Sequence, residues 1–238
     1  MKQPKKALER INHMAKKIGL PILANLPLIP SIQQKTSIRK LFSPQLATQT
    51  LCIWIAFFTV MAGFYFILSW TPKILAMAGM SVEQGVNLGI FLNIGGIIGA
   101  ILMGSISSRF QIHKILALFL IATSVSILIF VLFAQVYTYA LWIGILVGMM
   151  ANGCIAGLYA LSTVTYSTEI RATGVGLAIS MGRFGAIMAP LGAGYFLDIG
   201  ISPLHLYLFA AVLFSIGFIM LLISYRQYKQ FSLVIAKI

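Results

Sequence analysis

Long runs of apolar residues alternate with short polar connections along most of this chain. A transmembrane helix needs about 20 predominantly apolar residues, and six runs reach that length. No run alternates with the period of two that strands of a membrane barrel show. We therefore predict an all-α integral membrane domain in which neighbouring helices are antiparallel. The six predicted spans are Thr50–Met77, Gly85–Ile106, Ile115–Ala134, Thr138–Ser162, Gly174–Leu197 and Leu204–Tyr225.

The composition indicates lipid rather than water around this domain. Of the 238 residues, 60% are hydrophobic and only 9% are charged, whereas soluble proteins have roughly 25% charged residues. The net charge of +13 does not indicate nucleic acid as a partner, because the basic residues do not form an aromatic-rich patch. They lie in the first segment and in short connections, which is the pattern expected beside a lipid bilayer.

Basic residues lie almost entirely on one side of the predicted spans. Six spans place both termini on the same side, and that side has fifteen of the 17 lysines and arginines; the exceptions are Lys73 and Arg183. The positive-inside tendency therefore predicts cytoplasmic termini. We expect the protein in the plasma (inner) membrane. We divide the chain into a basic cytoplasmic segment (1–48), a six-helix domain (49–226) and a cytoplasmic tail (227–238).

Small residues recur at every fourth position in three of the predicted spans. Lipid supplies no hydrophobic force between helices, so close helix packing depends on small side chains. Smooth faces of this kind also suit the rocking of helices during alternating access, and the sequence leaves both interpretations open. The positions that we expect to pack helices are Gly96, Gly104, Gly148, Gly182 and Pro190.

Arg183 is the most informative single residue, because it lies near the middle of its predicted span. A charge at that depth is costly unless it faces protein, water or a partner. The four acids of the chain, Glu9, Glu83, Glu169 and Asp198, all lie outside the predicted spans. Three counterparts for the guanidinium remain open: an anionic substrate, a carboxylate on another domain, or backbone carbonyls and water. A guanidinium can grip a carboxylate with two hydrogen bonds, which suits an organic anion.

Four uncharged polar residues within the predicted spans are further candidates, and the two asparagines lie deep in the membrane. Asn93 and Asn152 lie in glycine-rich stretches, where they can join helices by hydrogen bonds or line a polar pathway. Tyr65 and Tyr159 are candidates for substrate contact, because each pairs a ring with a hydroxyl. Aromatic residues of the first span are nevertheless more often core or lipid-facing. We predict these four residues, with Arg183, as the substrate pathway.

No group of residues indicates an enzyme, a cofactor or a metal site. The histidines His13, His113 and His205 are scattered, and Cys52 and Cys154 each lie inside an apolar run without metal-ligand spacing. The sequence contains no phosphate-binding loop, no HExxH and no nucleophile elbow. We therefore predict no enzymatic activity, no cofactor and no metal.

Three stretches of the sequence resemble motifs of the major facilitator superfamily of transporters. Residues 104–114, GSISSRFQIHK, resemble its cytoplasmic connection between helices eight and nine. Residues 166–176, YSTEIRATGVG, resemble the connection between helices ten and eleven, and residues 182–190, GRFGAIMAP, resemble the helix-eleven signature. Residues 69–72 and 93–96 add to the resemblance, which runs from residue 1 to about residue 225. The chain is most similar to the aromatic acid:proton symporters.

This resemblance implies a fold, a substrate class and roles for particular residues. The fold is the carboxy-terminal six-helix half of the family, equivalent to helices 7–12, and the substrates are benzoate-type anions carried with protons. Arg183 matches a helix-eleven arginine implicated in transport. Arg109, Arg171 and Glu169 match the cytoplasmic gate, in which Ser108 stands where the family has Asp. Loss of that Asp removes a charge that helps to latch the gate.

The resemblance covers only half of the family's usual twelve helices. The other half of the family's members holds the membrane carboxylate of proton coupling. We therefore expect an N-terminal six-helix half or a second copy of this chain as partner, with residues 1–48 equivalent to the central interdomain linker. The chain would then be a truncated or split carrier. The alternative is a non-transporting membrane fragment or a helix-packing scaffold.

Overall fold

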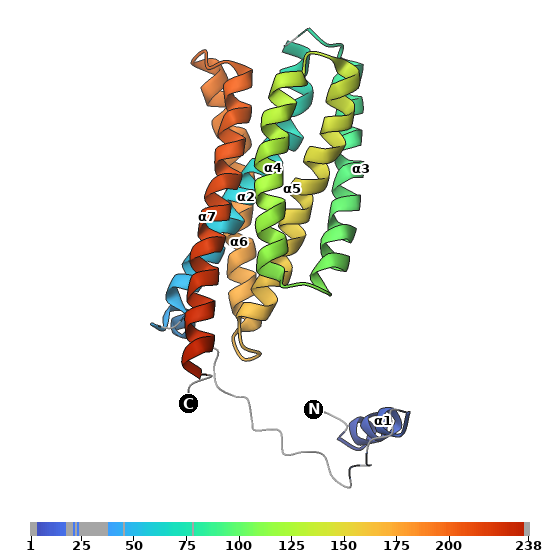
Figure 1. Ribbon diagram of the computed structural model, residues 1–238, viewed down its shortest axis with the longest axis vertical. Helices are drawn as coiled ribbons and strands as arrows, with labels where there is room; N and C mark the ends of the chain where they lie inside the picture. Colours follow the sequence, from blue (N-terminus) through green and yellow to red (C-terminus); the bar gives the residue numbers. More distant parts are fainter. Residues whose placement is uncertain are drawn as a thin grey trace. The chain divides into compact units, whose positions relative to one another are not determined.

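The computed structural model describes residues 4–17, 21, 23, 38–44, 46–77 and 79–235. The chain divides into two compact units, residues 1–37 and 38–238. The first unit contains helix α1 (Pro4–Lys17). In the second, a short 3₁₀ helix, η1 (Ile38–Phe42), precedes six long helices (Figure 1). These are α2 (Ala47–Met77), α3 (Val82–Ser107), α4 (Ile112–Phe133), α5 (Tyr137–Thr165), α6 (Arg171–Asp198) and α7 (Pro203–Ile235).

All six long helices are long and apolar enough to cross a membrane. Their spanning portions begin and end within three residues of the predicted bounds. The prediction of an all-α membrane domain with six spans is therefore confirmed. The α3 helix begins with a capping box, in which the Ser81 side chain accepts from the Gln84 backbone and the Gln84 side chain accepts from the Ser81 backbone.

Helices α2 and α5 are the two supports of the bundle. Both α6 and α7 pack on α2, both α3 and α4 pack on α5, and α4 meets α7 (Figure 1). The three-helix halves α2–α4 and α5–α7 thus exchange partners, since the first helix of each half supports the second and third helices of the other. Such a pairing of repeated halves is known in transporter folds. It places α3 and α6 on either side of the α2 and α5 pair.

Glycine lets the backbones of α3 and α5 come into direct contact. A Cβ atom added at Gly99 would lie 1.9 Å from the Met149 carbonyl oxygen, and one at Gly148 would lie 2.0 Å from the Leu92 carbonyl oxygen. No larger side chain fits at such a separation, so these glycines set the distance between the two helices.

Candidate functional site

Arg183 lies close to the middle of α6. It follows the first residue of the helix by 12 positions and precedes the last by 15, which is roughly 18 Å and 22 Å at 1.5 Å per residue. The side chain is exposed, and its Nη1 donates a hydrogen bond to the hydroxyl of Tyr65 on α2, 3.2 Å away. Among the described residues, no carboxylate lies within ion-pair distance of the guanidinium. In this part of the chain, the hydrogen-bond partner of the guanidinium is the Tyr65 hydroxyl.

The described acids near the bundle all lie at helix ends. Glu83 is in the first turn of α3, Asp198 is the last residue of α6, and Glu169 precedes α6. Arg183 is therefore separated along the helix axis from each of them by several turns. The positive charge remains available to an anion that comes from outside this six-helix domain.

Two glycines hold the Arg183 turn of α6 tightly against α2. A Cβ added at Gly182 would lie 2.5 Å from the Met61 sulfur, and one at Gly185 would lie 2.2 Å from the Phe58 carbonyl oxygen. Gly182 and Gly185 are buried, whereas Arg183 lies on the exposed face between them. This close approach brings the guanidinium within reach of a side chain on α2.

Asn152 and Asn93 line a second polar spot, between α2, α3 and α5. The Asn152 amide donates to the carbonyl of Gly96 on α3, at 2.9 Å, whereas the Asn93 amide bonds to a carbonyl in its own helix. Both asparagines border a cavity of about 20 Å³, together with Gly96, Gly148 and Phe64. A Cβ at Gly96 would lie 2.9 Å from the Asn152 amide nitrogen. Gly96 therefore makes room for this interhelical bond.

One stretch of α2 connects the two polar spots. Phe64 lines the asparagine cavity, and its neighbour Tyr65 bonds to Arg183. The two rings meet edge to face, with centroids 5.5 Å apart. Tyr159 is placed differently: it is half-buried on α5 and packs edge-on against Phe57, at 5.5 Å. No hydrogen bond in the described part of the chain joins Tyr159 to Arg183.

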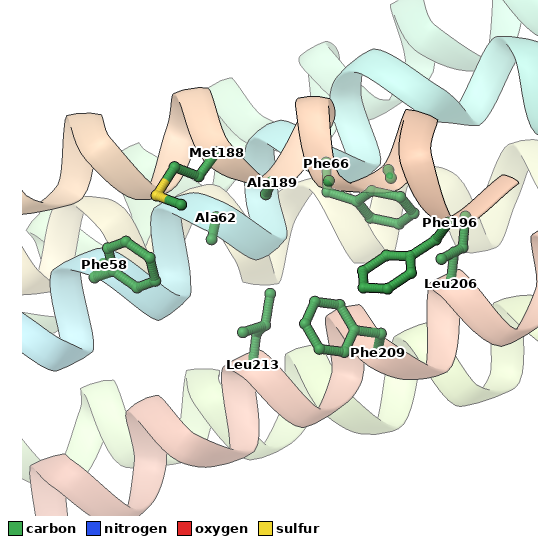
Figure 2. Close-up of a pocket in the computed structure, with 11 residues that line it drawn as sticks. Phe58, Ala62, Phe66, Met188, Ala189, Phe196, Leu206, Phe209 and Leu213 are labelled. Atoms are coloured by element: carbon green, nitrogen blue, oxygen red, sulfur yellow. The ribbon is translucent and has the colours of Figure 1, made fainter. Parts of the chain in front are cut away.

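A larger cavity, of about 170 Å³, lies elsewhere in the bundle and is apolar throughout. Helices α6 and α7 each pack on α2 but hardly touch one another, and the cavity fills the resulting groove. Figure 2 shows Phe66, Phe196 and Phe209 gathered at one end of it and Phe58 with Met188 at the other. No lining residue has a charge or a hydroxyl, so this groove has no group that binds a carboxylate.

Two predicted gate residues, Glu169 before α6 and Arg171 at its first position, have clear partners. The Glu169 carboxylate accepts a hydrogen bond from Lys40 of η1, at 3.3 Å. The Arg171 side chain donates to the backbone carbonyl of Tyr166, at 3.2 Å. Tyr166 is only 1% exposed. Burial raises the pKa of its phenol, and the Thr50 side chain beside it opposes that rise.

The other two predicted gate residues lie in the connection between α3 and α4. Ser108 bonds to the backbone carbonyl of Ser105, at 2.7 Å, and Arg109 is exposed. Neither bonds to Glu169 or Arg171 in the described residues. The predicted gate thus falls into two separate pairs.

Gly104, just before this connection, does not contact another helix. It is exposed, and a Cβ placed there would meet no described atom within 4 Å. The structure therefore gives no support for the predicted packing role of Gly104 within this domain. Gly104 lies on an exposed side of α3, whereas its neighbour Met103 packs against Gly157 of α5.

Sequence reasoning missed a hydrogen bond that involves Pro190. The indole nitrogen of Trp70 donates to the Pro190 carbonyl across the α2–α6 contact, at 3.0 Å. The ammonium of Lys73 lies 4.7 Å from the centre of the Trp70 ring. Tryptophan beside a membrane edge suggests an interfacial anchor, and only the fold shows its partner on another helix.

The sequence matches the Major Facilitator Superfamily over residues 2–190. The chain belongs to this superfamily. Curated relatives include the 3-(3-hydroxy-phenyl)propionate transporter of Escherichia coli, 31% identical over 71% of this chain and 41% of the relative. The gallate transporter of Pseudomonas putida is 32% identical over 73% of this chain and 38% of the relative. The benzoate transport protein of Acinetobacter baylyi is 31% identical over 76% of this chain and 38% of the relative. The chain spans about two-fifths of the length of these relatives.

Solved structures show the same fold. The domain superposes on the Escherichia coli fucose:proton symporter FucP with a TM-score of 0.66, at 16% identity, over 84% of this chain and 50% of that one. A structure of FucP in its outward conformation also superposes with a TM-score of 0.66, at 17% identity. At this identity the likeness concerns the fold alone, and it confirms the prediction of a six-helix half of the major facilitator fold. Each relative named here is described as a transporter, in agreement with the prediction that the chain is not an enzyme.

Proposed function

We propose that this chain provides one six-helix domain of a carrier for small aromatic carboxylates, with Arg183 as the group that binds the carboxylate. The three curated relatives are named for hydroxyphenylpropionate, gallate and benzoate, which share an aromatic ring and a carboxylate. The chain is an integral membrane protein with six apolar helices. The substrate class follows from these names together with the chemistry of the Arg183 site.

The observation that carries the proposal is the unpaired charge of Arg183 at the middle of α6. Its described partner is the neutral hydroxyl of Tyr65, which uses one of the five N–H donors of the guanidinium. The remaining donors can hold both oxygens of a carboxylate, and such charge-assisted pairs are about twice as strong as neutral hydrogen bonds. A substrate anion would thereby supply the counter-charge that this domain does not provide at that depth.

Aromatic side chains beside the guanidinium favour a substrate that has a ring. Tyr65 contacts Arg183 directly, and Phe64 lies edge-on to Tyr65. An edge-to-face or offset contact between aromatic rings contributes about 0.5–1.5 kcal/mol beyond simple burial. We propose that the carboxylate binds Arg183 while the ring of the substrate lies against Tyr65, with Asn93 and Asn152 further along the pathway.

We further propose that transport needs a second six-helix domain, either an N-terminal half or a second copy of this chain. The acids described in the bundle lie at its ends, so the proton acceptor for coupled transport would come from that second domain. The excess of basic residues at the end of the bundle with the termini supports cytoplasmic termini, and we propose the plasma membrane as the location.

The proposal can be tested by uptake into proteoliposomes. The chain would be reconstituted alone and together with the amino-terminal six helices of the hydroxyphenylpropionate relative, and supplied with radiolabelled benzoate. Cyclohexanecarboxylate is the matched probe, since it has the same carboxylate without an aromatic ring. We expect saturable uptake of radiolabelled benzoate. Unlabelled benzoate and gallate should inhibit this uptake, whereas cyclohexanecarboxylate should inhibit it poorly. Absence of uptake in both preparations would contradict transport and leave a helix-packing scaffold as the function.

Replacement of Arg183 tests the role of that residue separately. Arg183→Lys keeps the charge but loses the planar two-pronged geometry, so we expect normal membrane insertion and loss of benzoate binding. Arg226→Lys, at an exposed position of α7, is the matched control and should bind as the unmodified chain does. Unchanged binding in Arg183→Lys would mean that Arg183 has a structural role.

A further inference from the structure

The helix of the first unit, α1, has two faces with different chemistry. In its 14 residues there are five lysines and arginines and one glutamate. At 100° per residue, the apolar side chains fall within an arc of about 120° and the charged ones occupy the rest of the circumference. The apolar face has Leu8, Ile11, Met14 and Ala15, and the polar face has Glu9, Arg10, His13, Lys16 and Lys17.

The apolar face of α1 is open at its centre. Met14 is 67% exposed and Ile11 is 39% exposed, although Ala15 is buried. The Asn12 side chain makes two hydrogen bonds of 2.9 Å with the backbone of Leu23. Ile11 and Met14 remain exposed beside this contact. A helix with a charged face and an open apolar strip needs an apolar partner for that strip.

The charged face restricts what that partner can be. Arg10, Lys16 and Lys17 are exposed. At 100° per residue, Arg10 and Lys17 lie about 40° and 60° around the helix from Met14, so a partner must offer apolar groups and negative charge along one boundary. An anionic lipid surface does so, with acyl chains below a layer of phosphates. Nucleic acid would satisfy the cations but leave the apolar strip in water.

The attachment of α1 to the bundle keeps a bilayer within reach. Twenty residues, 18–37, separate the end of α1 from the start of η1, and a chain of that length spans at most roughly 70 Å at 3.3–3.6 Å per residue. Since the bundle itself is embedded in lipid, a membrane surface is available to α1 in every copy of the protein. A soluble partner would have to be present at high concentration to compete.

We infer that α1 is a membrane-surface helix that inserts Ile11 and Met14 among the acyl chains and binds anionic phospholipid headgroups through Arg10, Lys16 and Lys17. This function is independent of the proposed transport, because it requires only that the bundle lie in a bilayer. The helix would thereby recognise the lipid composition of the leaflet beside the first unit.

The test places a spin label on each face of α1 in the full-length chain. Met14→Cys carries the label on the apolar face, and His13→Cys is the matched position on the polar face, in a background with Cys52→Ala and Cys154→Ala. The labelled protein is placed in nanodiscs of phosphatidylcholine, with or without phosphatidylglycerol. Accessibility of the label to oxygen and to a water-soluble nickel chelate then reports its depth. We expect the label at position 14 to enter the bilayer when phosphatidylglycerol is present, and the label at position 13 to stay in water.

Removal of the charges tests the headgroup part of the inference. In the Met14→Cys background, Arg10→Gln, Lys16→Gln and Lys17→Gln should each lower the ratio of immersed to free label about fivefold, and high salt should act in the same direction. A label at position 14 that stays in water in both lipids would overturn the inference. Equal immersion without phosphatidylglycerol would overturn the requirement for anionic lipid, and withdrawal of the label on addition of RNA would assign the charged face to nucleic acid instead. Loss of benzoate uptake would affect none of these readings.

Discussion

The indole nitrogen of Trp70 and the backbone carbonyl of Pro190 form a hydrogen bond of 3.0 Å that joins α2 to α6. Pro190 lies seven residues beyond Arg183 on the same helix. The α2–α6 contact is therefore held at two levels, by this bond and by the bond from Arg183 to Tyr65. The first is a bond to the backbone, whereas the second joins two side chains.

Trp70→Phe should weaken the α2–α6 contact while an aromatic ring is kept at this position. The variant removes the N–H donor, so we expect the free energy of unfolding to fall by about 0.5–1.5 kcal/mol. Thermal unfolding in detergent micelles measures this loss. Trp142→Phe is the control, because Trp142 is 68% exposed on α5. Equal shifts in the two variants would show that the bond to Pro190 adds nothing specific.

Tyr65→Phe should weaken carboxylate binding while leaving the arginine in place. The hydroxyl holds one N–H group of Arg183, and a hydrogen bond to a charged group contributes about 1.5–3 kcal/mol. We therefore expect about tenfold weaker benzoate binding, measured by scintillation proximity in nanodiscs. Tyr195→Phe changes an exposed tyrosine on the same α6 helix and should bind normally. If both variants kept full affinity, Tyr65 would not orient the guanidinium.

Alanine at two glycines of α3 should have opposite effects on stability. At Gly99 the new Cβ would lie 1.9 Å from a carbonyl oxygen of α5, so the helices must separate, at a cost of about 1–3 kcal/mol. At Gly104 the Cβ enters open space, and alanine should favour the helix by up to about 1 kcal/mol. Urea or thermal unfolding of Gly99→Ala and Gly104→Ala compares the two. Destabilisation at Gly104 would indicate a contact with a further domain.

Leu41→Ala should loosen η1 far more than Glu169→Gln does. The Lys40–Glu169 pair is exposed, and such pairs contribute about 0–1 kcal/mol and less in high salt. Leu41 has 0% exposure, and its carbonyl accepts a hydrogen bond from Thr50; truncation of a buried leucine costs about 2–5 kcal/mol. Limited proteolysis between η1 and α2 measures the loosening. Faster cleavage in Glu169→Gln than in Leu41→Ala would reverse this order.

The sequence predicted the six spans well because the requirement for a span is local. Length and apolarity within each run determine whether a segment can cross the bilayer, and neighbouring runs need not be known. The depth of Arg183 follows in the same way, from its position within one run. These properties need no knowledge of which helices touch.

Pairings between helices could not be predicted, because they depend on how helices cross in space. Gly96 and Gly104 belong to one stripe of small residues, yet only Gly96 lies against α5, beside Asn152. A repeat of small residues at every fourth position identifies one face of a helix, but it does not show which positions on that face contact another helix. For the same reason the bond from Trp70 to Pro190 and the Lys40–Glu169 pair were not foreseen.

The exchanged packing of the two three-helix halves bears on the order in which the domain is made. Helix α3 finds its main support in α5 and α7 finds its support in α2, so the first three helices leave the ribosome before most of their partners exist. Their packing contacts can form only after the later helices are synthesised. This order also affects Arg183. When α6 emerges, Tyr65 is already within the membrane, and the arginine can meet its phenol as it enters the lipid.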